Sequence, residues 1–389
     1  MAHNNSRSVL YSGVGEALTQ YDVDVDGAAL TRRATVMLPS NVQYVWPHPS
    51  KRYLYLTTSD RGPGAGGPAG SKHFVAAFRI DAAGALEPHG VPQSLAARPL
   101  HNCVDATGSY ALTAYNNPSR VTVHRINGDG TLGEQVVQPG NLDTGIFAHQ
   151  VRVTLSNRAA ILVTRGNDAA GCKPEDPGAL KLFGFSDGAL SNLQSVAPGK
   201  GYGFGPRHLD FHPTEPWVYV SIERQNQLQM FRMPGDRLEG APAFSKSLLA
   251  EPHNEQPRQL GGPIHVHPNG RTVYVSNRAD NTVPYQGKGV FGGGENSIAV
   301  FAIDPRSGEP TLVQHIDTHG FHVRTFALDP SGRMLVAASI MSLPVRDGAR
   351  VITVPAGLSV FRVGSDGKLD FVRQYDVETG GKTQFWMGR

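Results

Sequence analysis

Short stretches in which apolar and polar residues alternate recur along the whole chain. Residues 207–221 (RHLDFHPTEPWVYVS), 262–276 (GPIHVHPNGRTVYVS) and 324–338 (RTFALDPSGRMLVAA) share one pattern. In each, an alternating run leads through a polar turn with Pro into a second run of β-formers, which predicts an antiparallel hairpin. A third and a fourth run follow, as in 358–363 (LSVFRV) and 368–377 (KLDFVRQYDV). The pattern therefore predicts a repeating unit of four short strands.

Six copies of this unit begin at residues 43, 100, 149, 207, 262 and 324. A period of about 50 residues with four strands per repeat is typical of a β-propeller. An incomplete seventh copy at the N-terminus lacks a first strand, and the C-terminal segment 383–387 is left over. We therefore predict an all-β, seven-bladed propeller with four antiparallel strands per blade. Its ring is expected to close by pairing of the C-terminal strand with the N-terminal blade, which removes exposed sheet edges.

The repeats leave no linker, so the prediction is a single domain over residues 1–389. A β-solenoid has shorter repeats, and a pair of sandwiches would not keep one four-strand pattern throughout. The 45 Gly and 28 Pro residues suit the many tight turns of such a fold.

Charge and the two cysteines limit the partners that we expect. The net charge is +3, with no long Lys/Arg run, so neither nucleic acid nor a membrane is an expected partner. The sequence shows no stretch typical of a signal peptide and no apolar window near the length of a membrane span. Cys103 and Cys172 can form neither a disulfide framework nor a Cys-rich zinc site. We expect a cytoplasmic protein that is a monomer or a weak homo-oligomer.

Polar and charged residues occupy strand ends that a propeller hairpin brings to one mouth of the channel. Counted from each turn, the first strands begin at Gln43, Leu100, His149, Arg207, Gly262 and Arg324. The second strands end at Ser59, Asn116, Arg165, Glu223, Arg278 and Ile340. In an antiparallel hairpin these two ends meet. Strand propensity favours β-branched and aromatic residues there, so the Arg, His and Glu residues indicate a site.

The longest insertions are predicted to emerge at the same mouth, because all lie between a second and a third strand. They are residues 62–70, 169–178, 283–295 and 341–355. Several Arg residues around one carboxylate suit a small anionic substrate, since a guanidinium group binds carboxylates bidentately. The alternative is that the Arg and Glu side chains only pair with one another and stabilise the fold.

The repeats PRHLDFHPTEPWVYVSIE, HPNGRTVYVSNRADNT and RTFALDPSGRMLVAAS resemble those of the seven-bladed propeller lactonase family. This family includes bacterial propeller-type 6-phosphogluconolactonases and fungal 3-carboxy-cis,cis-muconate cyclase. The resemblance extends from about residue 8 to the end of the chain. It implies a metal-independent site at one mouth of the channel, built from a His, a Glu and several Arg residues.

The resemblance also implies roles for individual residues. His149 in AHQVRV is similar to the active-site His of the family, and Arg207 and Glu223 are similar to its Arg/Glu pair. Arg278 in VSNRAD and Arg324 in VRTFALDP are similar to further anion-binding arginines. The sequence departs from the family pattern at residues 165–168, which read RGND where the family run resembles DLGTD.

We predict that the chain is a lactone hydrolase for a carboxylated or sugar-type lactone. The predicted catalytic residues are His149, Glu223 and Arg207. His149 would transfer the proton, because an imidazole titrates near neutrality, and Glu223 would orient it or activate water. The predicted substrate-binding residues are Arg278, Arg324, Arg165, Asn116, His101, His208 and Gln150. We expect neither a metal nor a cofactor.

Three alternatives remain open at the level of sequence. A muconate-type cycloisomerase, which closes a cis,cis-muconate diacid to a lactone, needs the same charges. A non-enzymatic propeller would bind a partner, although such propellers usually expose hydrophobic residues at a rim. A metal-dependent lactonase would need ligands, and His265 and His267 offer only an incomplete pair.

Overall fold

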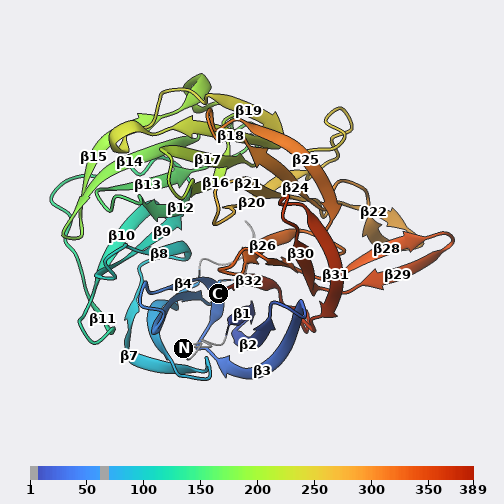
Figure 1. The fold of residues 1–389 in the computed structure, drawn as a ribbon, viewed down its shortest axis with the longest axis horizontal. Helices are drawn as coiled ribbons and strands as arrows, with labels where there is room; N and C mark the ends of the chain where they lie inside the picture. The colour runs from blue at the N-terminus through green and yellow to red at the C-terminus, as the bar shows by residue number, and fades with distance from the viewer. Residues whose placement is uncertain (1–7, 62–69) are drawn as a thin grey trace. The chain divides into compact units, whose positions relative to one another are not determined.

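The computed structural model describes residues 8–61 and 70–389, which form seven four-stranded sheets (Figure 1). Each sheet is one antiparallel blade, so the predicted all-β, seven-bladed propeller is confirmed. Two two-stranded hairpins and two short 3₁₀ helices, η1 (Pro198–Gly201) and η2 (Pro234–Asp236), complete the regular structure within these ranges. No helix in the described part of the chain is long and apolar enough to cross a membrane.

The strands of the first four blades follow the expected order along the chain. The blade that holds the N-terminus has the order β3 (Ala29–Met37), β2 (Ala17–Asp24), β1 (Val9–Val14) and β32 (Gln384–Gly388). The next blade consists of β4 (Asn41–Pro47), β5 (Tyr53–Ser59), β6 (His73–Ile80) and β7 (Leu86–Ser94). It is followed by β8 (Pro99–Val104), β9 (Tyr110–Asn116), β10 (Ser119–Ile126) and β11 (Leu132–Gln135). The fourth contains β12 (Ala148–Val153), β13 (Ala159–Thr164), β14 (Ala179–Ser186) and β15 (Ala189–Val196).

The last three blades repeat this order, and two of them carry an inserted hairpin. One consists of β16 (Pro206–Phe211), β17 (Trp217–Ile222), β18 (Gln227–Arg232) and β19 (Phe244–Ser247). The next consists of β20 (Leu260–Val266), β21 (Thr272–Arg278), β24 (Ser297–Ile303) and β25 (Pro310–Asp317). The last consists of β26 (Val323–Leu328), β27 (Met334–Ser339), β30 (Gly357–Val363) and β31 (Leu369–Asp376).

Two of the insertions that the sequence predicts contain β-hairpins of their own. Residues 283–295 contain most of the hairpin of β22 (Thr282–Tyr285) and β23 (Lys288–Phe291). Residues 341–355 contain the hairpin of β28 (Leu343–Asp347) and β29 (Arg350–Val354). Both hairpins project from their blades (Figure 1). Most of the Gly-rich segment 62–70 lies outside the described residues.

The chain divides into two compact units. One unit contains residues 1–162, 182–193 and 385–389, and the other contains residues 163–181 and 194–384. We refer to them as the N-terminal unit and the C-terminal unit. The prediction of a single domain over residues 1–389 stays a prediction.

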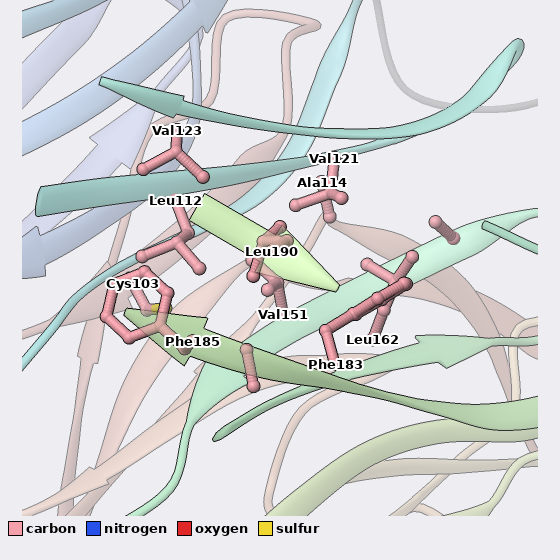
Figure 2. Packing of buried hydrophobic residues seen from close by; sticks show 12 residues of the cluster. Cys103, Leu112, Ala114, Val121, Val123, Val151, Leu162, Phe183, Phe185 and Leu190 are labelled. Carbon is pink, nitrogen blue, oxygen red and sulfur yellow. The ribbon is translucent and has the colours of Figure 1, made fainter. Parts of the chain in front are cut away.

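The N-terminal unit is held together by alternating strand residues that face one another between blades. Figure 2 shows such a core, in which the side chains of Leu112, Val123 and Val151 pack with Phe183 and Phe185. A second core includes Trp386 of β32, which packs in one cluster with Tyr11 and Val42. Because burial of a large aromatic side chain is strongly favourable, the β32 strand is fixed to the N-terminal blade, as predicted.

The C-terminal unit has a comparable core and a polar contact that fixes neighbouring turns. Tyr219, Met230 and Phe301 are fully buried in one cluster. His212 precedes the turn Pro, and its Nε2 lies 2.9 Å from the carbonyl oxygen of Gly270 in the next turn. Gly270 has φ +72°, and a Cβ atom there would lie 2.5 Å from the His212 ring. Only glycine suits this conformation and this contact together. His267 makes the equivalent contact with Gly332 O, at 2.9 Å, so it is a turn residue.

Candidate functional site

A β-bulge sets the direction of the Arg207 side chain. In the ladder between β16 and β17, Pro206 pairs with Ile222 and His208 pairs with Ser221, so Arg207 is the extra residue. Bulges re-aim a side chain and are common next to functional sites. The same irregularity recurs at the corresponding position of other blades, where the extra residues are Gln43, Leu100 and Arg324. Four of the six strand-start positions that the sequence singles out are therefore bulge positions.

Glu223 follows β17 directly and is fixed through its backbone. Its N–H donates to Gly205 O at 2.8 Å, and its carbonyl accepts a hydrogen bond from Gly261 N at 3.1 Å. These contacts join the end of β17 to the residue before β16 and to the start of β20. These backbone hydrogen bonds fix the position from which the Glu223 side chain extends.

Three guanidinium groups converge on the Glu223 carboxylate. Arg165 Nε contacts Oε2, Arg278 Nη2 contacts Oε1, and Arg207 Nε lies 3.2 Å from Oε1. Only 5% of Glu223, 3% of Arg278 and none of Arg207 is exposed. We call these four residues the Glu223 cluster. With three arginines and one glutamate it carries an excess of buried positive charge, which favours an anion or a developing oxyanion nearby.

A chain of ion pairs extends from Arg165. Arg165 Nη2 lies 2.9 Å from Asp168 Oδ2, and the other oxygen of Asp168 lies 2.7 Å from Arg224 Nε. Arg224 also pairs with Glu175, which accepts a hydrogen bond from Gly203 N at 2.7 Å. Burial alone would lower the pKa of Arg165, but Glu223 and Asp168 outweigh it and raise the pKa above its usual value. These contacts fasten the insertion after β13 to the segment that leads into β16.

A second chain extends from Arg278. Arg278 Nε donates to Gly261 O at 3.2 Å, and Nη1 donates to His322 Nε2 at 2.9 Å. His322 Nδ1 lies 3.3 Å from Asp280 Oδ2. Asp280 in turn accepts hydrogen bonds from Nε and Nη2 of Arg258, at 2.6 and 2.9 Å. The Glu223 cluster is thus continuous with a buried imidazole.

The pKa values along this chain are displaced by burial and by neighbouring charges. Burial lowers the pKa of His322 to about 4, and the Arg278 cation adds to this effect. Burial would raise the pKa of Asp280, but the neighbouring His322 ring and the hydrogen bonds from Arg258 outweigh it and hold the pKa well below its usual value. Burial also lowers the pKa of Arg278, against the opposing effect of Glu223. His322 is therefore neutral around pH 7, with Nε2 as an acceptor.

His322 makes the stability of the protein depend on pH in a defined window. Above pH 6.5 the ring is neutral in the folded and the unfolded chain, and it contributes nothing. As the pH falls from 6.5 to about 4, the unfolded chain takes up a proton that the folded chain does not. We expect this to lower the free energy of unfolding by up to about 3 kcal/mol. Asp280 acts below this window, since its usual pKa is 3.8 and its folded pKa is lower.

Denaturant unfolding at several pH values measures this dependence, with His322→Gln as the comparison. We expect the wild-type protein to lose more stability than the variant between pH 6.5 and 4. Parallel stability curves for the two proteins would show that the His322 ring is not held neutral.

The structure brings together five of the ten predicted site residues within the C-terminal unit. They are the Glu223 cluster and His208, whose Nδ1 accepts a hydrogen bond from Arg207 Nη1 at 3.2 Å. Arg324 lies in β26 of the same unit and is half-buried. Its charge contributes to the lowered pKa of His322, so it lies within electrostatic range of the second chain.

The other four predicted residues belong to the N-terminal unit. His149 and Gln150 are buried in β12, and the His149 ring is nearly parallel to that of Phe147, with centroids 6.3 Å apart. Asn116 is the last residue of β9. His101 in β8 is fully buried, with its ring centroid 4.0 Å from that of Tyr44 and 5.7 Å from that of Trp46. The roles of all four stay predictions.

Sequence reasoning missed the residues that extend the cluster. These are Asp168, Glu175, Arg224, Arg258, Asp280 and His322. Four of them were close in sequence to residues that it singled out: Arg224 follows Glu223 directly, Asp168 follows Arg165 by three positions, Asp280 follows Arg278 by two, and His322 precedes Arg324 by two. The sequence signal that could have identified them was the presence of charged or titratable residues within a few positions of the singled-out strand starts and strand ends. Among the described residues, no group of three or more His, Cys, Asp or Glu could hold a metal ion.

The fold is a seven-bladed propeller with an Arg-rich cluster around one buried carboxylate. Comparison with known proteins identifies the family of propellers to which it belongs. The family model described as "Lactonase, 7-bladed beta-propeller" matches residues 8–346. The chain therefore belongs to the seven-bladed β-propeller lactonase family.

Its relatives in this family include several 6-phosphogluconolactonases. The chain is 29% identical to the 6-phosphogluconolactonase of Bacillus subtilis (strain 168) over 337 residues, which cover 84% of this chain and 85% of the relative. It is 27% identical over 310 residues to the enzyme of the same name from Pectobacterium carotovorum subsp. carotovorum (strain PC1), which covers 79% and 80% of the two chains.

Solved structures show the same fold at lower sequence identity. A putative 6-phosphogluconolactonase from Bacteroides uniformis gives a TM-score of 0.72 at 18% identity, over 98% of this chain and 99% of that one. The periplasmic gluconolactonase PpgL of Pseudomonas aeruginosa gives a TM-score of 0.68 at 21% identity, over 96% and 97%.

Proposed function

We propose that this protein is a lactonase that hydrolyses a sugar-type or carboxylated lactone, and that the Glu223 cluster is part of its active site. The observation that carries the proposal is the buried carboxylate of Glu223 with three guanidinium groups, in a chain of the lactonase family. The names of the curated relatives favour a phosphorylated sugar lactone as the first substrate to test.

The proposed reaction is the addition of water to the lactone carbonyl. The water oxygen bonds to the carbonyl carbon, and the water proton passes to a general base. The ester bond to the ring oxygen then breaks, and the same group returns a proton to the leaving alkoxide, which yields a hydroxy acid. We assign the proton transfer to His149, because histidine is the side chain that most often acts as a general acid or base.

The charges of the Glu223 cluster suit the other requirements of this reaction. A tetrahedral intermediate carries negative charge on the former carbonyl oxygen, and fixed cations lower its free energy. Arg207 and Arg278 are almost completely buried, so we assign them to holding Glu223 in place. Arg165 and Arg324 are more exposed, and we assign them to the anionic groups of the substrate. Glu223 would orient the attacking water.

A substrate panel tests the proposal. It contains 6-phosphogluconolactone, gluconolactone and a muconolactone, together with a cis,cis-muconate for the lactonising direction. We expect ring opening of a sugar lactone well above its spontaneous rate. Activity on the muconate pair alone would replace the proposal with the cycloisomerase hypothesis. No acceleration of any reaction would favour a propeller that binds a partner.

A further inference from the structure

We propose that His322 is a positioning residue, which holds the Arg278 guanidinium against Glu223 by accepting a hydrogen bond while Asp280 fixes its tautomer. Its kinetic consequence rests on the proposed lactonase function. Its structural consequence does not, because the contacts concern only residues of the C-terminal unit.

The donors of Arg278 are distributed over three separate acceptors. Nε donates to Gly261 O, Nη1 donates to His322 Nε2, and Nη2 contacts the Glu223 carboxylate. Because the guanidinium group is planar, these three directions define the plane and the rotation of the group. Gly261 supplies a backbone acceptor, so among the described residues His322 is the one side chain besides Glu223 that accepts a hydrogen bond from Arg278.

The tautomer of His322 follows from these contacts. An arginine can only donate hydrogen bonds, so Nε2 must be the unprotonated nitrogen of the ring. The proton is then on Nδ1, which faces Asp280 Oδ2 at 3.3 Å. Asp280 is itself held by two hydrogen bonds from Arg258. The carboxylate selects the tautomer, and the tautomer provides the acceptor for Arg278.

The backbone around His322 is built to hold this arrangement. His322 has φ +54°, a region that non-glycine residues seldom adopt. Asn296 Oδ1 accepts hydrogen bonds from both His322 N and Ala279 N, at 2.8 and 3.0 Å. Ala279 stands between Arg278 and Asp280, so Asn296 joins the His322 backbone to the segment that carries both of its partners. Unfavourable conformations of this kind tend to persist at functional sites.

Loss of the His322 acceptor is expected to release Arg278. A buried N–H group without an acceptor is costly, and the guanidinium group would rotate to find another. Glu223 would then shift with it. A displacement of about 1 Å at a catalytic group can lower the rate by about 10²-fold. Substrate binding through other arginines would change less, so the effect should fall on kcat rather than on KM.

Two variants of His322 separate positioning from bulk. His322→Gln keeps an acceptor at the end of the side chain, whereas His322→Leu removes it. The matched control is His319→Leu, because His319 also has a positive φ of 57° in the same segment and is exposed. With the lactone that the wild type hydrolyses fastest, we expect His322→Leu to lower kcat by about 10²-fold with little change in KM. His322→Gln should recover most of the loss, and His319→Leu should match the wild type.

A measurement that needs no substrate completes the test. In ¹⁵N-labelled protein at pH 6, we expect the His322 ring to be the neutral Nδ1–H tautomer, and its signals to be identified by their loss in His322→Gln. We also expect the Arg278 Nε–H signal to exchange slowly in the wild type and in His322→Gln. This signal should be lost in His322→Leu. If His322→Leu does not fold, Asp280→Asn replaces it and should raise the share of the other tautomer.

The outcomes distinguish the two proposals. An Nε2–H or protonated ring at pH 6 would overturn the positioning role, and so would an unchanged Arg278 signal in folded His322→Leu. Equal kcat values for the two His322 variants would also overturn it. A wild-type protein that opens no lactone but shows the expected tautomer and Arg278 signals would overturn the proposed function while supporting the positioning role.

Discussion

Glu223→Gln is expected to lower the free energy of unfolding by about 3–5 kcal/mol, because it removes one partner from buried ion pairs. Arg165, Arg207 and Arg278 all contact the Glu223 carboxylate. Glutamine preserves the size of the side chain but removes the negative charge that Arg207 and Arg278 contact, whereas Arg165 keeps its ion pair with Asp168. Denaturant unfolding at pH 7 measures the difference.

The matched control for this variant is Glu215→Gln. Glu215 is exposed in the turn between β16 and β17 of the same hairpin. We expect this control to change stability by no more than about 0.5 kcal/mol. If both variants had equally small effects, the arginines would not depend on Glu223 for their charge balance.

His149→Ala is expected to lower kcat by about 10²–10⁴-fold, the usual contribution of a positioned general acid or base. His149 is buried in β12, so the substitution leaves the surface charge unchanged and a fall in kcat could not be attributed to surface charge. Steady-state kinetics with the best lactone of the substrate panel measures the effect. His253→Ala, at an exposed position, serves as the control and should keep wild-type turnover.

The double variant His149→Ala/Glu223→Gln adds a further constraint. Because both residues are assigned to the same reaction, the double variant should be at least as slow as the slower single variant. Full activity in the double variant would contradict the catalytic assignment of both residues.

The fold could be predicted because each blade repeats a period-two pattern that a single strand needs in order to bury one face. The N-terminal copy lacked a first strand and the C-terminus had a spare one, which pointed to the pairing of β32 with β1. The two inserted hairpins could not be predicted in the same way. Only Val290 and Leu343 of their strand residues are buried, and others such as Val283 and Ile352 are exposed, so burial imposes no regular alternation on them.

The part of the site that lies at the ends of strands could be predicted from the sequence, because strand pairing determines where those ends meet. Arg207 lies at the start of a first strand, Glu223 directly follows a second strand and Arg278 ends one, so the hairpin register brought them to one end of their blades. Asp280 and His322 lie beyond the strand ends, where no strand period applies. Their contacts depend on side-chain conformation and on the Asn296 bridge, neither of which a sequence pattern records.

The central claim is that the Glu223 cluster serves the opening of a lactone ring. Its most direct test is kcat of folded Glu223→Gln for the lactone that the wild type hydrolyses fastest, measured beside Glu215→Gln. The account predicts a loss of about 10²–10⁴-fold in Glu223→Gln and wild-type turnover in the control. Wild-type turnover in folded Glu223→Gln would contradict it.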